Sequence, residues 1–467
     1  MTTKSGVTHQ FPEPIPLRKL IGPSFVILAL GLGSGEIILW PYLASNYGLG
    51  IIWGALLGIT FQYFINMEIE RYALVKGESV FVGIAKLWRG APIWFIVSTF
   101  AGFGLPGIIA ASAKVFASIT GIPDFRWVAA ASLIVIGCIL SSGKTVYGLI
   151  EKLTKTVILF CVPIIFILAV LLSTHADWTA LFQGFIGRGD GYTFLPEGIA
   201  LATFLGAFAY AGAGGNLNLT QSIYVREKGY GMGKFSQKIA GLFTANGVQQ
   251  DIKLEGEALA INATAKKNFA VWWRRISIEH GVVFWFIGAL SIALLALLSF
   301  ATTYGMEGNI QGITFVITEG QVIGSILGPL VGWFFLLVVS LLLFQTQLGV
   351  LDSTSRIMAE NAAIMQMKWN GKKSVHLSKI YFIFLWAQIA FGVLLFAMNV
   401  SDPKSLIILG ACLNAFAMFA HIGFVSHLNH HSLPKPFQAA LWRKILLAII
   451  FLFFGVFSAI VALDQVR

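Results

Sequence analysis

Charged residues are scarce in this sequence. They make up 11% of its 467 residues, whereas soluble domains carry about 25%. Apolar residues account for 57% of the chain, and the mean hydropathy is +0.80. Long, nearly uncharged runs exclude a water-soluble domain and predict a polytopic membrane protein whose surface contacts the lipid bilayer.

Cysteine is also rare. The 3 cysteines, Cys138, Cys161 and Cys412, each lie inside an apolar run, which excludes a disulfide framework and a CxxC metal site. Ser142 to Thr145 resembles the end of a phosphate-binding loop but lacks its glycine spacing. We therefore predict no cofactor. The net charge of +11 comes from loops between apolar runs, so nucleic acid is not a predicted partner.

Eleven apolar segments are long enough to cross a bilayer, which takes about 20 residues each. Lys and Arg gather in alternate loops, on the side that holds 1–19 and 226–275. Because cytoplasmic loops carry this excess, we expect the N-terminus inside and the C-terminus outside, in a bacterial cytoplasmic membrane. The expected spans are 20–46, 50–75, 92–118, 126–143, 153–174, 197–225, 276–302, 326–351, 379–399, 404–427 and 441–463.

The chain is predicted to be one transmembrane domain over 1–467. A cytoplasmic tail, 1–19, precedes six spans in 20–225, and five more spans fill 276–467. The polar segment 226–275 between them is expected to be a cytoplasmic loop with short amphipathic helices. The first 19 residues are polar and no cleavage site follows the first span, so no removable signal peptide is predicted.

Glycines interrupt two of the spans. Gly31, Gly33 and Gly35 precede Glu36 in the first span, and Gly212, Gly214 and Gly215 interrupt the sixth. Each glycine costs a helix about 1 kcal/mol relative to alanine. Gly-interrupted spans at corresponding positions of two halves indicate a transporter binding site. We therefore predict an all-α inverted repeat of spans one to five and six to ten, with spans one and six broken and an eleventh added.

Unwound breaks free backbone carbonyls, and the C-terminal ends of half-helices suit a cation. Glu36 places a carboxylate near the membrane centre, where an ionisable group is a functional candidate; the alternative is a partner to a buried base such as Lys114. Glu36, Gly33 and Asn216 are the predicted metal ligands. The predicted substrate-binding positions are Leu32, Gly33, Ser34, Gly35, Glu36, Ala209, Tyr210, Ala213, Gly214, Gly215, Asn216 and Gln345.

Other polar residues have a structural alternative. Gln345 and Gln347 could line a pathway or hydrogen-bond between helices, and Asp352 could pair with Arg356 at i,i+4. Glu68, Glu70 and Arg71 are typical of a solvated or paired helix end, whereas the role of the deeper Asn66 stays open. The histidines His421, His427, His430 and His431 could suggest a membrane enzyme, but they run off the end of span ten as a basic interfacial fringe. An enzyme is not predicted.

Several short stretches resemble the Nramp family (natural resistance-associated macrophage protein) of divalent-metal transporters. They are Ile21-Gly22-Pro23, Asn46-Tyr47-Gly48, Arg71 to Gly77 and Asn216 to Leu219. The resemblance covers most of spans one to eight and implies a LeuT-like fold. The signature residues depart from the family: Gly33 to Glu36 stand where it has Asp-Pro-Gly-Asn, and Ala213 to Gly215 where it has Met-Pro-His. The family's acids are also missing from the third span, Thr99 to Gly107.

The resemblance and the breaks together predict a secondary transporter that moves a divalent metal cation by alternating access. An all-oxygen ligand set with one carboxylate favours a hard cation such as Mg or Mn. The alternative is a LeuT-like transporter of a small organic solute whose Nramp metal site has been lost. Without acids in the third span, we expect transport without obligatory proton movement. The oligomeric state, the direction and the exact substrate are not predicted.

Overall fold

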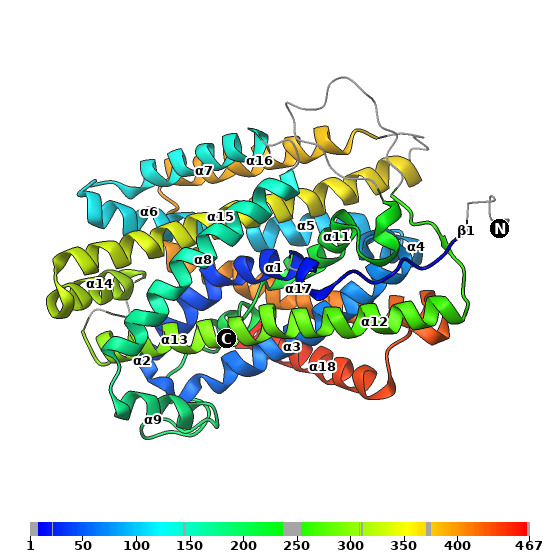
Figure 1. Cartoon of the computed structure of the whole chain (residues 1–467). Coiled ribbons are helices and arrows are strands. Elements are labelled where there is room, and N and C mark those ends of the chain that lie inside the picture. The colour runs from blue at the N-terminus through cyan, green and yellow to red at the C-terminus, as the bar shows by residue number, and fades with distance from the viewer. Residues whose placement is uncertain are drawn as a thin grey trace.

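The structure is a computed structural model that describes residues 8–20, 22–142, 146–236, 254–307, 309, 312–369 and 375–464. Almost all of this is helix (Figure 1). Two short strands, β1 (Thr8–His9) and β2 (Ala258–Leu259), pair in parallel and join the N-terminal segment to the segment before the seventh span. The helices that cross the bundle contain long apolar stretches, as the sequence predicts.

Ten helices of the described chain are long and apolar enough to cross a membrane, which makes the chain a multi-pass membrane protein. The sixth predicted span consists instead of α10 and α11, each 9 residues long and too short alone. The spans are built from α1 (Pro23–Gly31) with α2 (Trp40–Tyr47), α3 (Trp53–Lys76), α5 (Ala91–Phe103) with α6 (Gly107–Thr120), α7 (Phe125–Ser142), α8 (Val146–Leu172), α10 (Leu201–Ala209) with α11 (Thr220–Lys228), α12 (Ala263–His280) with α13 (Ile287–Thr303), α15 (Pro329–Lys368), α16 (Leu377–Ala397), α17 (Pro403–Ser432) and α18 (Leu441–Asp464).

Shorter helices connect the spans. They are α4 (Val80–Leu87), α9 (His175–Gly184), α14 (Thr314–Leu327) and the 3-10 turns Leu17–Lys19, Leu49–Ile51, Gly215–Leu219, Gly231–Phe235 and Lys435–Phe437. In Figure 1, α9 and α14 lie at one end of the bundle, and α4 and the start of α12 lie at the other. The end with α4 also holds Lys86 and Lys267, in keeping with the predicted division of basic loops.

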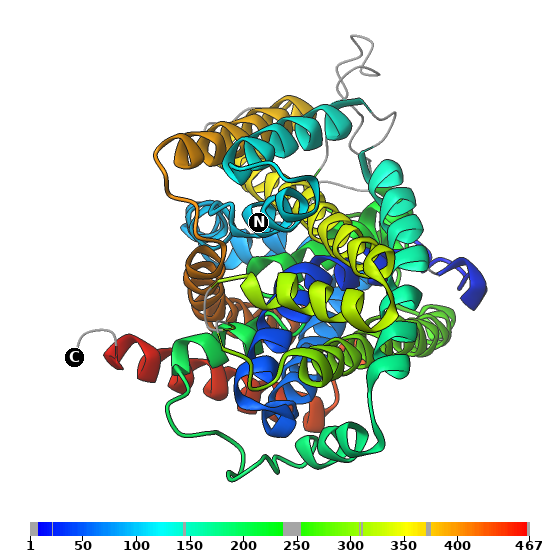
Figure 2. The same ribbon diagram turned by 90° about the vertical axis from the view of Figure 1, so that its left-hand side faces the viewer.

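The first span lies in the middle of the molecule. Its most apolar stretch is entirely buried, whereas only about a fifth (22%) of the corresponding stretch of α18 is. Figures 1 and 2 show α7 and α16 side by side at one edge of the bundle and α18 at the opposite edge. Only the outer helices can therefore contact lipid over much of their length, and the first span is surrounded by protein.

The seventh and eighth spans are longer than predicted. The helix of span seven begins at Ala263 instead of 276, so the last part of the predicted 226–275 loop is helical. Its buried residues Ala265, Phe269, Trp272 and Ile276 recur at helical spacing, a signal that the polar composition hid. Span eight continues to Lys368 instead of ending near 351, because its polar second half is buried and paired within protein.

The first span is interrupted in a different way from the prediction. Residues Leu32–Leu39 form a π-helical segment between α1 and α2 instead of unwinding, and Trp40 N–H donates to the Gly35 carbonyl. Wider π turns keep backbone groups paired while changing the direction of side chains. The helix does not unwind at Leu32 and Gly33, so their carbonyls are not freed in the way that the sequence predicted. A second π segment, Gly281–Phe286, separates α12 from α13.

Candidate functional site

The break in the sixth span is present as predicted. Helix α10 ends at Ala209, and helical structure resumes only at Gly215. Gly214 and Gly215 have φ angles of 71° and 50°, in the left-handed region that glycine adopts at little cost. A Cβ on Gly215 would lie 2.0 Å from Asn414 Oδ1. The break thus needs glycine both for its backbone turn and for the close approach of α17.

A side chain from the second span holds the two ends of this break together. Gln62 Nε2 donates to the Ala209 carbonyl (2.9 Å), and Gln62 Oε1 accepts from Gly214 N–H (3.0 Å). Both groups lack a partner within an interrupted helix. The sequence analysis missed Gln62 because a single glutamine in an apolar run carries no sign of which span it will meet.

The glycines of the first span serve close packing against this break. A Cβ on Gly35 would lie 1.6 Å from the Tyr210 carbonyl oxygen, and one on Gly31 would lie 2.7 Å from the Gly212 carbonyl carbon. Gly33 faces the eighth span instead, where its Cβ would be 2.5 Å from Thr346 Cβ. Small residues four apart are a common solution for close helix contact in membranes.

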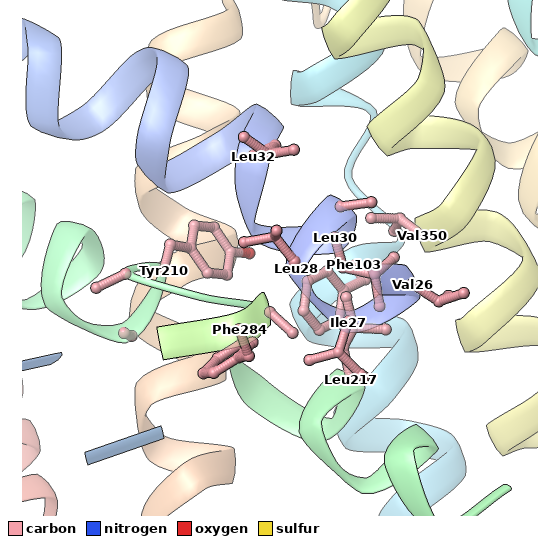
Figure 3. Packing of buried hydrophobic residues seen from close by; sticks show 14 of the residues in the cluster. Val26, Ile27, Leu28, Leu30, Leu32, Phe103, Tyr210, Leu217, Phe284 and Val350 are labelled. Carbon is pink, nitrogen blue, oxygen red and sulfur yellow. The ribbon is translucent and has the colours of Figure 1, made fainter. Parts of the chain in front are cut away.

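Side chains around this contact are largely apolar. Figure 3 shows the Tyr210 ring beside Leu28 and Phe103, and the rings of Tyr210 and Phe103 stack with centroids 5.9 Å apart. Leu32 points into an apolar environment of α8 and α13. Ser34 and Ala213 are buried in the same core.

Glu36 is fully buried within the π segment, and neither of its carboxylate oxygens has a hydrogen-bond partner among the described residues. It is not paired with Lys114, the predicted structural alternative. A Cβ on Gly288 of α13 would lie 3.7 Å from Glu36 Oε1. The carboxylate therefore faces the seventh span, in a space kept open by a glycine. An unpaired buried carboxylate is costly unless a cation or proton joins it.

The other predicted ligands face different neighbours. Asn216 donates from Nδ2 to Ser98 Oγ (2.8 Å) and Thr99 Oγ1 (3.0 Å) of α5, and its Oδ1 has no partner in the described part. Gln345 donates to Thr154 Oγ1 of α8 at 2.9 Å. The structure thus brings Gly35, Tyr210 and the sixth-span glycines together. Gly33, Asn216 and Gln345 instead contact the eighth span, α5 and α8. Gln345 therefore forms a hydrogen bond between helices, which was the structural alternative to lining a pathway.

A small cavity borders the break on its other side. Its volume is about 10 Å³, room for about one water. Tyr210 and Gln347 line it, together with α5, the start of α6 and α17. Asn414 Nδ2 donates to Tyr210 Oη (2.8 Å) and to the Gly102 carbonyl (2.9 Å). The third span is itself interrupted here, between Phe103 and Gly107, which the sequence analysis did not predict.

A second polar cluster lies further along spans two, six and seven. Ser24 Oγ donates to Glu279 Oε2 at 2.5 Å and lies 2.9 Å from His280 Nδ1. Gln221 Nε2 donates to Glu70 Oε2 at 3.3 Å. The carboxyl groups of Glu70 and Glu279 influence each other electrostatically. Within the described chain, neither has an ion-pair partner, and Glu70 is buried, so it is not the solvated or paired helix end that the sequence suggested.

Two unpartnered amides lie one helical turn before this cluster. Asn66 precedes Glu70 by four residues on α3, and Asn218 precedes Gln221 by three on the neighbouring span-six segment. Residues at these spacings share a helix face, and α3 contacts both Gly215–Leu219 and α11. Both amides are fully buried without a partner in the described residues. Polar groups therefore continue from the sixth-span break toward the end that holds α4.

The negative charge of this cluster affects Tyr230, in the loop that follows α11. Burial, with the carboxylates of Glu279 and Glu70 nearby, raises the pKa of Tyr230. The phenol therefore stays protonated and donates to the Leu20 carbonyl at the start of the first span.

Buried ion pairs tie α11 to the eighth span at the same end. Arg356 contacts Glu227 at 2.6 Å and Asp352 at 2.8 Å, and Arg226 contacts Glu360 at 2.8 Å. Tyr381 of α16 also donates to Asp352 (2.8 Å). The predicted pairing of Asp352 with Arg356 is confirmed, and the additional partners come from spans that the sequence could not connect. In the part of the chain that the structure describes, no three His, Cys, Asp or Glu side chains converge to hold a metal ion.

No family model matches the sequence, and no curated protein matches it. Several solved structures match the chain in fold. A variant of the Eremococcus coleocola manganese transporter matches with a TM-score of 0.69 and 12% identity, over 97% of this chain and 89% of that one. The same transporter in complex with an aromatic bis-isothiourea substituted compound matches with a TM-score of 0.67 and 12% identity, over 98% of this chain and 90% of that one.

A second branch of matches leads to a transporter of the nucleobase-cation-symport-1 family. This protein, Mhp1 with bromovinylhydantoin bound, matches at a TM-score of 0.55 and 13% identity over 97% of this chain and 93% of that one. The chain has the LeuT fold. The Nramp resemblance predicted this fold, and the broken sixth span with its central first span is where the sequence analysis placed the site.

Proposed function

We propose that this protein is a secondary transporter that moves a small ion or solute by alternating access, with a divalent metal cation as the leading substrate. The observation that carries the proposal is Glu36, a buried carboxylate without a partner among the described residues, at the centre of the bundle. Its π segment packs on the sixth-span break, and π segments often occur at functional sites. A cation at Glu36 would offset the cost of the buried charge.

The carboxylate of Glu36 is an oxygen donor and favours a hard cation that keeps part of its hydration shell. Oxygen donors suit Mg and Mn, whereas soft metals prefer sulfur, and a hydrated ion needs few carboxylates. The scaffold shared with a manganese transporter supports this class. The unpaired amides of Asn66 and Asn218 would give the ion a polar route toward the end with α4, which we propose is cytoplasmic in a bacterial membrane.

A small organic solute is the second candidate. It is favoured by the absence of a converging metal-ligand group in the described part. The Tyr210, Phe103 and Gln347 side chains beside the break could contact an organic molecule, and Mhp1 is a structural neighbour with such a ligand.

Uptake into proteoliposomes separates the two candidates. Wild type is assayed with Mn, Mg, Cd and a panel of organic solutes, beside Glu36→Gln and the control Glu319→Gln. Glu319 is also a buried carboxylate, but it lies in α14 and accepts a hydrogen bond from Ser299 (2.8 Å). We expect Mn or Mg uptake that Glu36→Gln abolishes and Glu319→Gln preserves. Organic uptake that survives Glu36→Gln, with no divalent uptake at all, would contradict the metal proposal.

Proton coupling is tested in the same vesicles with a pH-sensitive dye. The third span lacks acids, so we expect substrate uptake without a stoichiometric pH change. Glu70 and Glu279 are the buried acids that could change this result. A pH change that follows substrate uptake and disappears in Glu70→Gln or Glu279→Gln would show that spans two and seven supply the acid missing from span three.

A further inference from the structure

A pocket between the ends of α17, α18 and α3 lies beside a group of basic side chains. Its volume is about 110 Å³, and its polar lining comprises Glu68, Ser426, Asn429, His430, Gln438 and Lys444. His430 is exposed and Lys444 is half-buried, so the pocket reaches the protein surface. It lies apart from the sixth-span break, and His430 is the one histidine of the predicted interfacial fringe that lines it.

The charges around this pocket do not balance. Glu68 is bound by two guanidinium groups, Arg71 Nε at 2.8 Å and Arg443 Nε at 2.7 Å. Lys444 adds another positive charge, and its Nζ contacts only Gln438 Oε1 and His430 Nδ1 among the described residues, each at 3.3 Å. Arg443 Nη2 is buried without a partner in that same part of the chain. One carboxylate and three cations therefore lie in or beside the pocket, and this excess of positive charge attracts an anion.

The surface next to the pocket is apolar and suited to acyl chains. Along α18 the residues Leu441, Ile445, Ile449, Leu452 and Val456 recur at helical spacing, and each has at least half of its surface exposed. Trp442 is also exposed, at 56%, and tryptophan at a span end is typical of the membrane interface. The anion site and the apolar stripe adjoin at the start of α18, as the head group and the chains of one lipid do.

We propose that this pocket binds the phosphate of an anionic phospholipid in the cytoplasmic leaflet, with the acyl chains along α18. Basic pockets between transmembrane helices on that side are known to take anionic head groups. Lys444 Nζ and the Ser426 hydroxyl donate to the phosphate, and the excess charge of Arg443 attracts it. The phosphate supplies the negative charge that Glu68 alone does not.

Native mass spectrometry of the full chain in detergent tests this site. The protein is titrated with phosphatidylglycerol, with phosphatidylcholine and with inorganic phosphate. We expect phosphatidylglycerol to bind more tightly than either comparison ligand. Lys444→Ala should weaken it about fivefold, the usual effect of removing one interfacial charge, and Lys444→Arg should retain it. Lys152→Ala removes an exposed lysine near the start of α8 and should leave the affinity for phosphatidylglycerol unchanged.

Two results would overturn the proposal. If Lys444→Ala and Lys152→Ala weaken phosphatidylglycerol equally, the attraction is a general property of the basic surface. If inorganic phosphate binds as tightly as the lipid, the ligand is a soluble anion. The Lys444→Arg variant and a thermal unfolding scan of each protein show whether a loss of binding reflects misfolding.

Discussion

Gly35 illustrates how tightly single residues are constrained near the break. Because a Cβ there would overlap the Tyr210 carbonyl oxygen at 1.6 Å, even alanine must push the first and sixth spans apart. Overpacking of this kind costs about 1–3 kcal/mol. We expect Gly35→Ala to lower the unfolding temperature and to abolish uptake.

Gly324→Ala is the matched control for that substitution. Gly324 lies in α14, and its Cβ would be no closer than 3.6 Å to any neighbouring atom. Since alanine favours helix more than glycine does, this variant should be as stable as wild type or slightly more stable. Equal behaviour of the two variants in thermal unfolding would show that the close contact at Gly35 is unimportant.

The hydrogen bonds of Gln62 can be tested by hydrogen exchange. Gln62→Leu leaves the Ala209 carbonyl and Gly214 N–H without their partner, and each unsatisfied buried group costs about 1–3 kcal/mol. Exchange measured by mass spectrometry should accelerate in a peptide that covers the break, while peptides from α18 keep their rate. Unchanged exchange at the break would mean that other groups or water hold these two atoms.

At the scale of elements, buried ion pairs hold α11 and α15 together at the end of the bundle with α4. Arg356→Met leaves Glu227 and Asp352 as unpaired buried charges, and breaking such a pair costs about 3–5 kcal/mol. We expect a large drop in the unfolding temperature. The triple change Glu227→Gln, Asp352→Asn, Arg356→Met should recover much of it, because no unpaired charge remains.

The partly exposed ion pair of Asp124 and Arg126, with 2.7 Å between Arg126 Nη2 and Asp124 Oδ2, provides the control for the Arg356 substitution. Each of these side chains is about one-third exposed, and surface pairs contribute little. Arg126→Met should therefore leave the unfolding temperature nearly unchanged. A similar loss in Arg126→Met and Arg356→Met would show that burial of the charges does not matter.

Apolar runs and glycine clusters predicted most of the spans and the broken sixth one. They could not predict the helix of span eight beyond residue 351, because buried residues such as Asp352 and Arg356 have the composition of a membrane boundary. The partners of the site were also hidden: Gln62 meets Ala209 across 147 residues, and Thr346 Oγ1 donates to the Ala29 carbonyl across 317. Such pairs depend on tertiary packing, which the local pattern of a single sequence does not reveal.

The orientation of the whole molecule is a prediction from the alternation of basic loops. It can be tested with single cysteines in a protein whose three native cysteines are replaced by serine. Lys267→Cys lies near the start of α12 and His175→Cys at the start of α9, and both positions are exposed. We expect an impermeant maleimide to label His175→Cys in intact cells and Lys267→Cys only after lysis. The reverse pattern would invert the topology.

The length of the seventh span has a mechanical consequence. Its helices extend over 41 residues from Ala263 to Thr303, about 60 Å at 1.5 Å per residue and twice the thickness of the hydrocarbon core. The N-terminal segment is fastened to α12, because Trp272 Nε1 donates to the Pro12 carbonyl (3.0 Å) and Arg275 Nη1 to that of Ile15 (2.7 Å). The π segment Gly281–Phe286 is the point at which α12 can change its angle to α13. A small tilt of α12 at this segment would displace the start of α12 most. The hydrogen bonds to the N-terminal segment would pass that displacement on to the first span.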